Sequence, residues 1–181
     1  MSISMLLDIA VEQYGDRTAL GGVDSGISYR AMDRLSKAGA ADLHADESRS
    51  LVFVGVNGTT VPLLLFSAAR AGVPFVPLNY RLSSGALCDL LGELDRPRVI
   101  ADESFAPALT AGLGGTVRVT TSTEWLANCE ERAALAAWEP PVDASPTAIV
   151  LFTSGTTAKP KGVLLRHENL ISYILGTVEL G

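Results

Sequence analysis

Apolar runs and helical segments alternate along the middle of the chain, and this alternation constrains the fold more than any other feature of the sequence. A continuous apolar run at residues 51–56 is followed by a helical pattern at 61–71 and by a short apolar run at 75–77. Continuous apolar runs are typical of parallel strands covered on both faces, and parallel strands need a crossover between them. The sequence therefore predicts a βαβ unit.

The same alternation continues to about residue 120 and extends the expected sheet. Further strands are expected at 98–101 and 117–120, and further helices at 82–94 and 104–113. Alternating strands and helices are the pattern of the α/β class. We therefore expect an α/β fold that contains part of a doubly wound, mostly parallel sheet flanked by helices.

The rest of the chain is expected to add short elements on either side of this unit. Before it we expect helices at 4–14 and 29–43, with Ser4 and Ser28 as N-caps, and strands at 18–20 and 26–28; after it, a broken helix at 123–138 and a final helix at 168–180. The chain then divides into N-terminal helices and a hairpin at 1–49, the α/β unit at 50–138, a linker at 139–146, and a strand pair with its loop and following helix at 147–181.

A polar stretch of ten residues, 153–162, lies between two apolar runs and has the composition of a phosphate-binding loop. Gly155 permits a sharp turn and a close approach of the backbone to an anion. The hydroxyls of Ser154, Thr156 and Thr157, together with backbone N–H groups, can form an anion-binding concavity. Composition alone leaves a solvated hairpin loop open, because Ser, Thr, Gly and Pro are also ordinary turn residues.

Two of the three lysines of the chain, Lys159 and Lys161, lie in this loop, and the third is Lys37. This concentration indicates a local task. A Walker-type loop is excluded, because that motif places its lysine after the second glycine and opens a helix. Here six residues separate Gly155 from Gly162, the lysine precedes the second glycine, and a strand-like run follows. A nucleotide sensor or kinase of that type is therefore disfavoured.

The loop sequence TSGTTAKPKG resembles the phosphate-loop signature of the adenylate-forming superfamily, [ST]-S-G-T-T-G-x-P-K-G, at nine of ten positions. This superfamily includes acyl-CoA synthetases, fatty acyl-AMP ligases, luciferases and the adenylation domains of peptide synthetases. The exception is Ala158, where the pattern has Gly. A left-handed backbone at that position would cost an alanine roughly 1–2 kcal/mol.

Two other stretches resemble elements of the same superfamily. Residues 69–79, ARAGVPFVPLN, resemble K-A-G-A-x-Y-V-P-L-[DN], and we expect them to be core scaffold rather than active site. Asn79 and Arg81 favour the CoA-ligase branch over the peptide-synthetase branch. Ser28-Tyr29 resembles the start of the [TS]-Y-x-E-L element.

The resemblance implies an ATP-dependent acid ligase of the acyl-CoA synthetase type. In such enzymes a carboxylate attacks the α-phosphate of Mg-ATP to give acyl-AMP and pyrophosphate, and the thiol of CoA or of a carrier protein then takes the acyl group. The positions that the resemblance assigns to ATP binding are Thr153, Ser154, Gly155, Thr156, Thr157, Lys161 and Gly162. It also makes Thr156 the candidate ligand of Mg²⁺. His167 is expected either to support the loop or, more simply, to be a hydrogen-bonded structural residue.

The adenylation lysine and the acid pocket of the superfamily have no counterpart in this sequence. We therefore expect the 181-residue chain to be the N-terminal portion of such an enzyme, with no catalytic residue of its own and no activity alone. The alternative is a non-catalytic, truncated paralogue or interaction module that keeps the fold, and Ala158 supports it.

Composition narrows the possible partners and the location. The net charge of −6 argues against a nucleic-acid binder, which needs a basic face. The first residues lack the basic start of a signal peptide, and the longest apolar run, 61–66, is too short to span a membrane. Cys88 and Cys129 lack metal-ligand spacing and favour the cytoplasm. With 48% hydrophobic residues, surface that the rest of the enzyme would cover is expected to drive self-association.

Overall fold

The computed structural model describes residues 1–22, 25–133, 141, 144–153 and 161–177, and a six-stranded sheet lies at the centre of this described part. Its strands, in spatial order, are β6 (Val119–Thr121), β5 (Pro97–Ala101), β3 (Ser50–Val54), β4 (Phe75–Leu78), β7 (Thr147–Thr153) and β8 (Lys161–Arg166). The first five are parallel, and β8 pairs antiparallel with β7 at the edge. The predicted α/β class with a mostly parallel sheet is confirmed.

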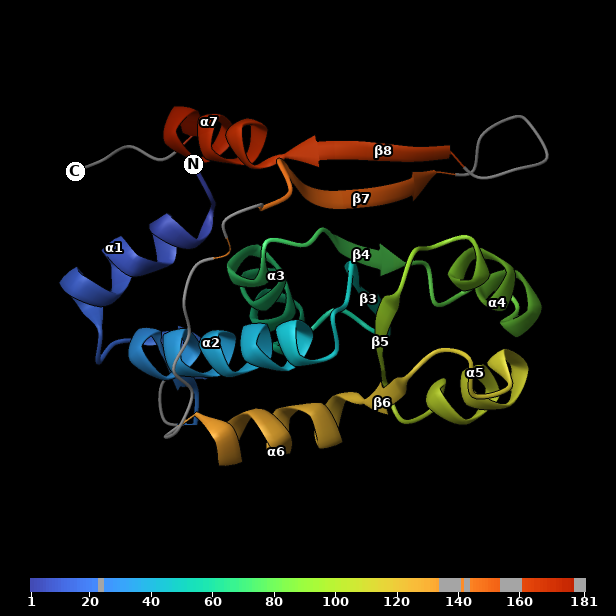
Figure 1. Cartoon of the computed structure of the whole chain (residues 1–181). Helices are drawn as coiled ribbons and strands as arrows, with labels where there is room; N and C mark the ends of the chain where they lie inside the picture. Colours follow the sequence, from blue (N-terminus) through green and yellow to red (C-terminus); the bar gives the residue numbers. More distant parts are fainter. Residues whose placement is uncertain (23–24, 134–140, 142–143, 154–160, 178–181) are drawn as a thin grey trace.

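Helices cover both faces of the sheet (Figure 1). One layer holds α2 (Tyr29–Ala45), α3 (Thr60–Ala71) and α6 (Ser122–Arg132), and the other holds α4 (Ser84–Gly92) and α5 (Ala106–Leu113). Side chains alternate between the faces of a strand. Leu51 and Phe53 of β3 accordingly pack with the first layer, and Val52 and Val54 pack with the second. Burial on both faces explains why the central strands read as continuous apolar runs.

Side-chain caps and a glycine define the ends of several helices, and Ser28 is the N-cap that the sequence predicts. Ser28 and Ser83 cap α2 and α4, where each hydroxyl accepts a hydrogen bond from the backbone N–H three residues on, at 3.2 and 3.3 Å. Thr121 and Glu124 form a reciprocal capping box at the start of α6. Gly72 ends α3 with a left-handed φ of 71°, a conformation that favours glycine.

The structure corrects some expected boundaries. Helix α1 (Ser4–Tyr14) begins at Ser4 itself, so the prediction that Ser4 is its N-cap is wrong. The Ser2 hydroxyl instead accepts a hydrogen bond from Ser4 N–H at 3.3 Å. Helix α5 begins later than expected because a turn anchored on the Asp102 carbonyl precedes it. Helix α6 ends at Arg132, and residues 134–140 lie outside the described part.

The remaining elements complete the two ends of the chain. The N-terminal hairpin consists of β1 (Thr18–Leu20) and β2 (Ile27–Ser28), and α7 (His167–Thr177) follows β8. Trp125 of α6 is buried in the first helical layer. None of the described helices has the length and apolar character needed to cross a membrane.

Candidate functional site

The loop that is predicted to bind phosphate joins β7 to β8, and these strands run side by side along the edge of the sheet (Figure 1). Thr153 at the end of β7 faces Lys161 at the start of β8 in the antiparallel register. The Thr153 hydroxyl donates a hydrogen bond to the Lys161 carbonyl oxygen at 3.3 Å. The expected strands on either side of the loop are therefore confirmed.

The structure brings together three of the seven residues predicted to bind ATP. Thr153, Lys161 and Gly162 lie at the end of the hairpin that borders the loop, and all three are exposed. Among the described residues no carboxylate lies within ion-pair distance of the Lys161 ammonium group, which leaves its charge available to an anion. The other residues singled out in this loop lie outside the described part: Ser154, Gly155, Thr156, Thr157, Ala158 and Lys159.

Packing does not require a glycine at position 162. A Cβ there would lie 3.4 Å from Val150 Cγ1 and 3.8 Å from Phe152 Cε1, which are ordinary contact distances. Gly162 also has no left-handed φ. A glycine inside a strand leaves room for a ligand or another backbone to approach closely.

A second group of polar residues follows β4 at the same, carboxyl edge of the sheet. Asn79 and Arg81 are exposed there, and Arg81 N–H donates a hydrogen bond to Asn79 Oδ1 at 3.1 Å. The Arg81 guanidinium carbon lies 5.5 Å from the centre of the Tyr80 ring. Within the stretch 69–79, Ala69 and Phe75 are buried, as expected of core scaffold, whereas Asn79 and the nearby Arg81 are exposed. Open α/β sheets bind ligands outside the carboxyl ends of their strands.

The carboxylate that directly follows β5 already accepts hydrogen bonds. Asp102 accepts a hydrogen bond from Val56 N–H at 2.7 Å and another from the Ser122 hydroxyl at 2.9 Å. These bonds tie the loop after β3 to the start of α6. A carboxylate held in this way supports the fold of the edge and is not free to act as a base.

His167 lies at the far end of β8 from the loop, about 20 Å from Lys161 at the usual rise of a strand. Its Nδ1 accepts a hydrogen bond from Ile3 N–H at 3.4 Å, and its side chain is buried. Burial lowers the pKa of His167 below the ordinary value, and the positively charged chain terminus lowers it further. The structural interpretation of His167 is confirmed, and a role beside the loop is wrong.

Two buried arginines were not predicted from the sequence, and the first is Arg70. Its Nη2 lies 2.6 Å from a carboxylate oxygen of Asp8 and 2.6 Å from one of Asp33, and its Nε donates to the Ser36 hydroxyl at 2.9 Å. The network joins α1, α2 and α3. Arg70 lies seven residues after Leu63 on the buried face of α3, and this spacing is the signal that could have revealed it.

The second buried arginine, Arg98, lies in β5. Its Nε is 3.3 Å from an oxygen of Asp42 and 3.2 Å from one of Asp46, and its Nη1 donates to Thr120 Oγ1 at 2.8 Å. Burial lowers the pKa of Arg98, and the Asp42 carboxylate opposes this effect. Arg98 is the one charged residue of this otherwise apolar strand, and that position is the sequence signal that could have revealed its burial. Both networks hold elements together and lie away from the loop.

The described residues hold no group of three or more His, Cys, Asp or Glu side chains that could bind a metal ion. The proposed Mg²⁺ ligand, Thr156, lies outside the described part. Cys88 and Cys129 are free thiols, and burial raises the pKa of Cys129 to about 12. That thiol stays protonated and unreactive at neutral pH.

The sequence matches a family model described as AMP-binding enzyme over residues 7–180. It is 31% identical to 2-succinylbenzoate–CoA ligase of Listeria monocytogenes over 140 residues, which cover 77% of this chain and 27% of that enzyme. It is 26% identical to cyclochlorotine synthetase of Talaromyces islandicus over 174 residues, which cover 90% of this chain and 3% of that synthetase. The chain thus spans well under a third of the length of these relatives.

The fold also resembles solved structures. VinN in complex with 3-methylaspartate superposes with a TM-score of 0.80 at 27% identity, over 97% of this chain and 52% of VinN. A benzoate CoA ligase from Burkholderia xenovorans LB400 gives a TM-score of 0.79 at 20% identity, over 97% of this chain and 36% of the ligase. The second likeness shows the fold alone.

Proposed function

Because this chain belongs to the AMP-binding enzyme family and corresponds to the N-terminal region of adenylate-forming enzymes, we propose that it is part of an ATP-dependent carboxylic acid ligase. The observation that carries this proposal is the hairpin that holds the sequence TSGTTAKPKG between the ends of β7 and β8. The full enzyme activates an acid as acyl-AMP and passes the acyl group to a thiol.

The loop at 153–162 acts electrostatically in this proposal. When the acid attacks the α-phosphate of ATP, negative charge is released on the departing pyrophosphate. Lys161 and the loop hydroxyls, with backbone N–H groups, stabilise that charge at the β- and γ-phosphates. The exposed Lys161 ammonium without a described carboxylate partner, and the open backbone at Gly162, support this role.

Magnesium belongs to the proposal as the ion that accompanies ATP. When bound, it offsets the charge of the phosphates, and we assign the Thr156 hydroxyl as its protein ligand within this loop. The thiol acceptor is CoA or a carrier protein. Relatives of both kinds, a CoA ligase and a nonribosomal peptide synthetase, align with the chain, and the exposed Asn79 and Arg81 favour CoA.

The chain is proposed to act as one domain in the cytoplasm. The sheet draws strands from both the 50–138 and the 147–181 segments, which supports a single structural unit. The free thiols of Cys88 and Cys129 suit a reducing compartment.

Nucleotide titration of the 181-residue chain by calorimetry tests the loop. Lys161→Ala is expected to weaken ATP binding roughly 10- to 100-fold, the effect of losing one charge-assisted hydrogen bond. The matched control is Lys37→Ala, which removes a lysine paired with Asp33 at 2.9 Å on α2. Equal ATP affinity of the wild type and Lys161→Ala would reject the loop as the ATP site.

A second measurement tests whether the chain is inactive alone. ATP–pyrophosphate exchange with a panel of carboxylic acids should not exceed the rate of the Lys161→Ala variant. Exchange above that background would show that the chain adenylates without further residues. A non-catalytic module, which Ala158 favours, would bind no ATP at all, and calorimetry separates it from an incomplete enzyme.

A further inference from the structure

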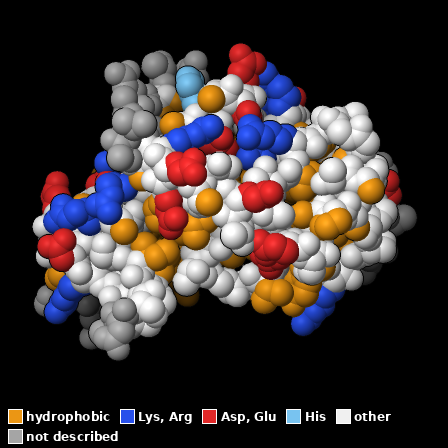
Figure 2. Space-filling view, turned by 90° about the horizontal axis from the view of Figure 1, so that it is seen from below, with side chains coloured by type: hydrophobic (Ala, Val, Ile, Leu, Met, Phe, Trp, Pro, Cys, Tyr) orange, Lys and Arg blue, Asp and Glu red, His pale blue; other side chains and the backbone are white. Residues whose placement is uncertain are grey.

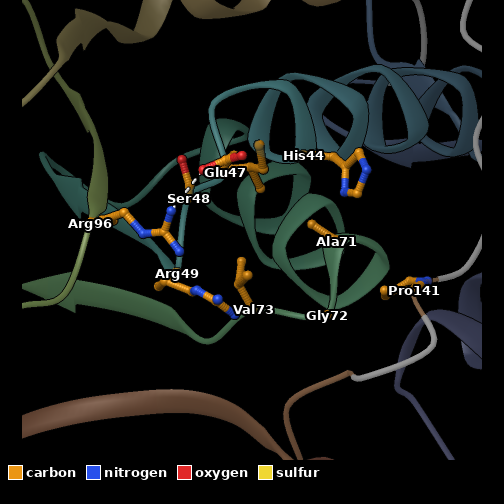
Figure 3. A pocket seen from close by; sticks show the side chains of 10 residues that line it. His44, Glu47, Ser48, Arg49, Ala71, Gly72, Val73, Arg96 and Pro141 are labelled. Carbon is orange, nitrogen blue, oxygen red and sulfur yellow. Dashed lines mark hydrogen bonds and ion pairs between the residues drawn. The ribbon is translucent and has the colours of Figure 1, made fainter.

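A surface cavity lies at the amino edge of the sheet, opposite the edge that carries the hairpin loop (Figure 3). It measures about 490 Å³ and forms where β3 and β5 begin and where α2 and α3 end. Apolar side chains of Leu43, Ala71 and Val73 line it together with the charged side chains of Arg49 and Arg96. The volume lies within the range of small-molecule sites, and polar and apolar groups both contribute to the lining.

The backbone forces the two arginines together. Arg49 N–H donates a hydrogen bond to the Arg96 carbonyl at 3.0 Å, and the residues that follow, Ser50 and Pro97, are register partners in β3 and β5. Neighbouring strands lie about 4.8 Å apart, so the two side chains start at about that spacing. Figure 3 shows them extending side by side along the cavity.

Only one carboxylate balances these two positive groups. Glu47 Oε2 lies 2.8 Å from Arg96 Nη1, whereas no described residue forms an ion pair with Arg49. Two guanidinium groups and one carboxylate leave one positive charge unbalanced. His44 also lines the cavity.

The backbone is strained at the same place. Glu47 and Arg96 have φ angles of 52° and 39°, and they are the two non-glycine residues with positive φ in the described part. Such conformations cost free energy in residues with a Cβ, and they cluster at ligand sites. Both strained residues line this one cavity, and their side chains form an ion pair with each other.

The ends of α2 and α3 act in the opposite direction, because helix C-termini favour cations. Their terminal carbonyls, however, are already bonded by backbone donors: Ser48 N–H donates to Leu43 O and Val73 N–H donates to Ala68 O, each at 3.0 Å. Within the described part the Arg49 guanidinium makes no hydrogen bond. The helix ends therefore do not use the charge of Arg49.

We propose that this cavity binds a small molecule in which one carboxylate or phosphate group is joined to a compact apolar body. The anionic group bridges Arg49 and Arg96, since guanidinium groups bind such oxygens in a bidentate manner. The apolar body packs against Leu43, Ala71 and Val73. The site is separate from the ATP loop, which lies at the other edge of the sheet.

Titration of the 181-residue chain with phenyl phosphate and with benzoate, followed by protein NMR, tests this proposal. Both probes carry an apolar ring, and together they separate the phosphate and carboxylate sources of the anion. Chemical-shift changes are expected at residues 44–49, 72–73 and 96. Arg49→Gln should weaken the tighter probe at least about tenfold. The matched control Arg34→Gln removes an exposed arginine of α2 outside the cavity and should change affinity less than about twofold.

Lys161→Ala separates this site from the ATP loop, because it should leave phenyl phosphate binding at the cavity intact. Unchanged binding in Arg49→Gln, in a variant whose thermal unfolding matches the wild type, would overturn the proposal. Loss of binding in Lys161→Ala would overturn it as well. Inorganic phosphate that binds as tightly as phenyl phosphate would show that the apolar wall contributes nothing and would also overturn it.

Discussion

His167 connects the first residues of the chain to the start of α7, and it does so as a neutral imidazole. Its Nδ1 accepts the Ile3 N–H hydrogen bond, which requires the ring proton to lie on Nε2. Protonation of Nδ1 would replace an acceptor with a donor and would place a charge in a buried site. The neutral form is therefore the one that the fold stabilises, and burial lowers the pKa of His167 accordingly.

This lowered pKa predicts a pH dependence of stability. Below the ordinary histidine pKa of 6.5 the unfolded chain binds a proton that the folded chain does not, so acid favours unfolding. The contribution is complete above that pH and is lost as the pH falls towards the folded-state pKa. The free energy of unfolding in urea should drop from about pH 7.5 to about pH 5.5 more steeply in the wild type than in His167→Gln. Parallel pH profiles for the two proteins would contradict this prediction.

At the scale of elements, Arg70 is the point at which three helices meet. It belongs to α3, and its partners Asp8 and Asp33 lie on α1 and α2. Its side chain is 1% exposed and that of Asp33 is 12% exposed. A carboxylate buried to this degree depends on its partner cation, because it has little water to solvate it.

Arg70→Ala is therefore expected to be strongly destabilising, by about 3–5 kcal/mol in denaturant unfolding, because it leaves Asp33 buried with a weakened set of partners. The matched control is Arg30→Ala. Arg30 pairs with Asp16 at 3.2 Å on the surface, where an ion pair contributes less than about 1 kcal/mol. If the two variants lose similar stability, the Arg70 network is not what holds α1 and α2 against α3.

The elements were predictable where their cause is local. The run at 51–56 indicated a strand because both of its faces are buried, and Ser28 indicated a helix start because a cap depends on nearby residues. The strand order was not predictable, because pairing joins distant segments. The same limit hid Arg70 and the pairing of Arg49 with Arg96. At the loop, the motif located Thr153 and Lys161, while only the register showed that they face each other.

At the scale of the whole molecule, six of the twelve large exposed hydrophobic side chains of the described part belong to its C-terminal elements. They lie on the β7–β8 hairpin and on α7: Leu151, Val163, Leu164, Tyr173, Ile174 and Leu175. The face seen from below in Figure 2 carries acidic and basic side chains interspersed with hydrophobic ones. The hairpin and α7 therefore form the surface that needs cover, from the rest of the enzyme or from a second copy.

Without such cover the 181-residue chain is expected to self-associate through the exposed apolar side chains of the hairpin and α7. Edge-to-edge pairing of two β8 strands is disfavoured, because an antiparallel pair centred on Val163 and Leu164 would place Lys161 opposite Arg166. Leu164 is 61% exposed, so Leu164→Asp should shift the chain towards monomer with little change in its unfolding free energy.

Sedimentation velocity over a range of protein concentrations measures this association, and Leu82→Asp is the matched control. Leu82 is an exposed leucine just before α4, outside the hairpin and α7, and its substitution should leave the association unchanged. Because the association buries apolar surface, raising the salt concentration should not dissolve it, whereas an association through charges would weaken. A wild-type chain that stays monomeric at the highest concentration would mean that the exposed side chains on β8 and α7 are too scattered to act as one surface.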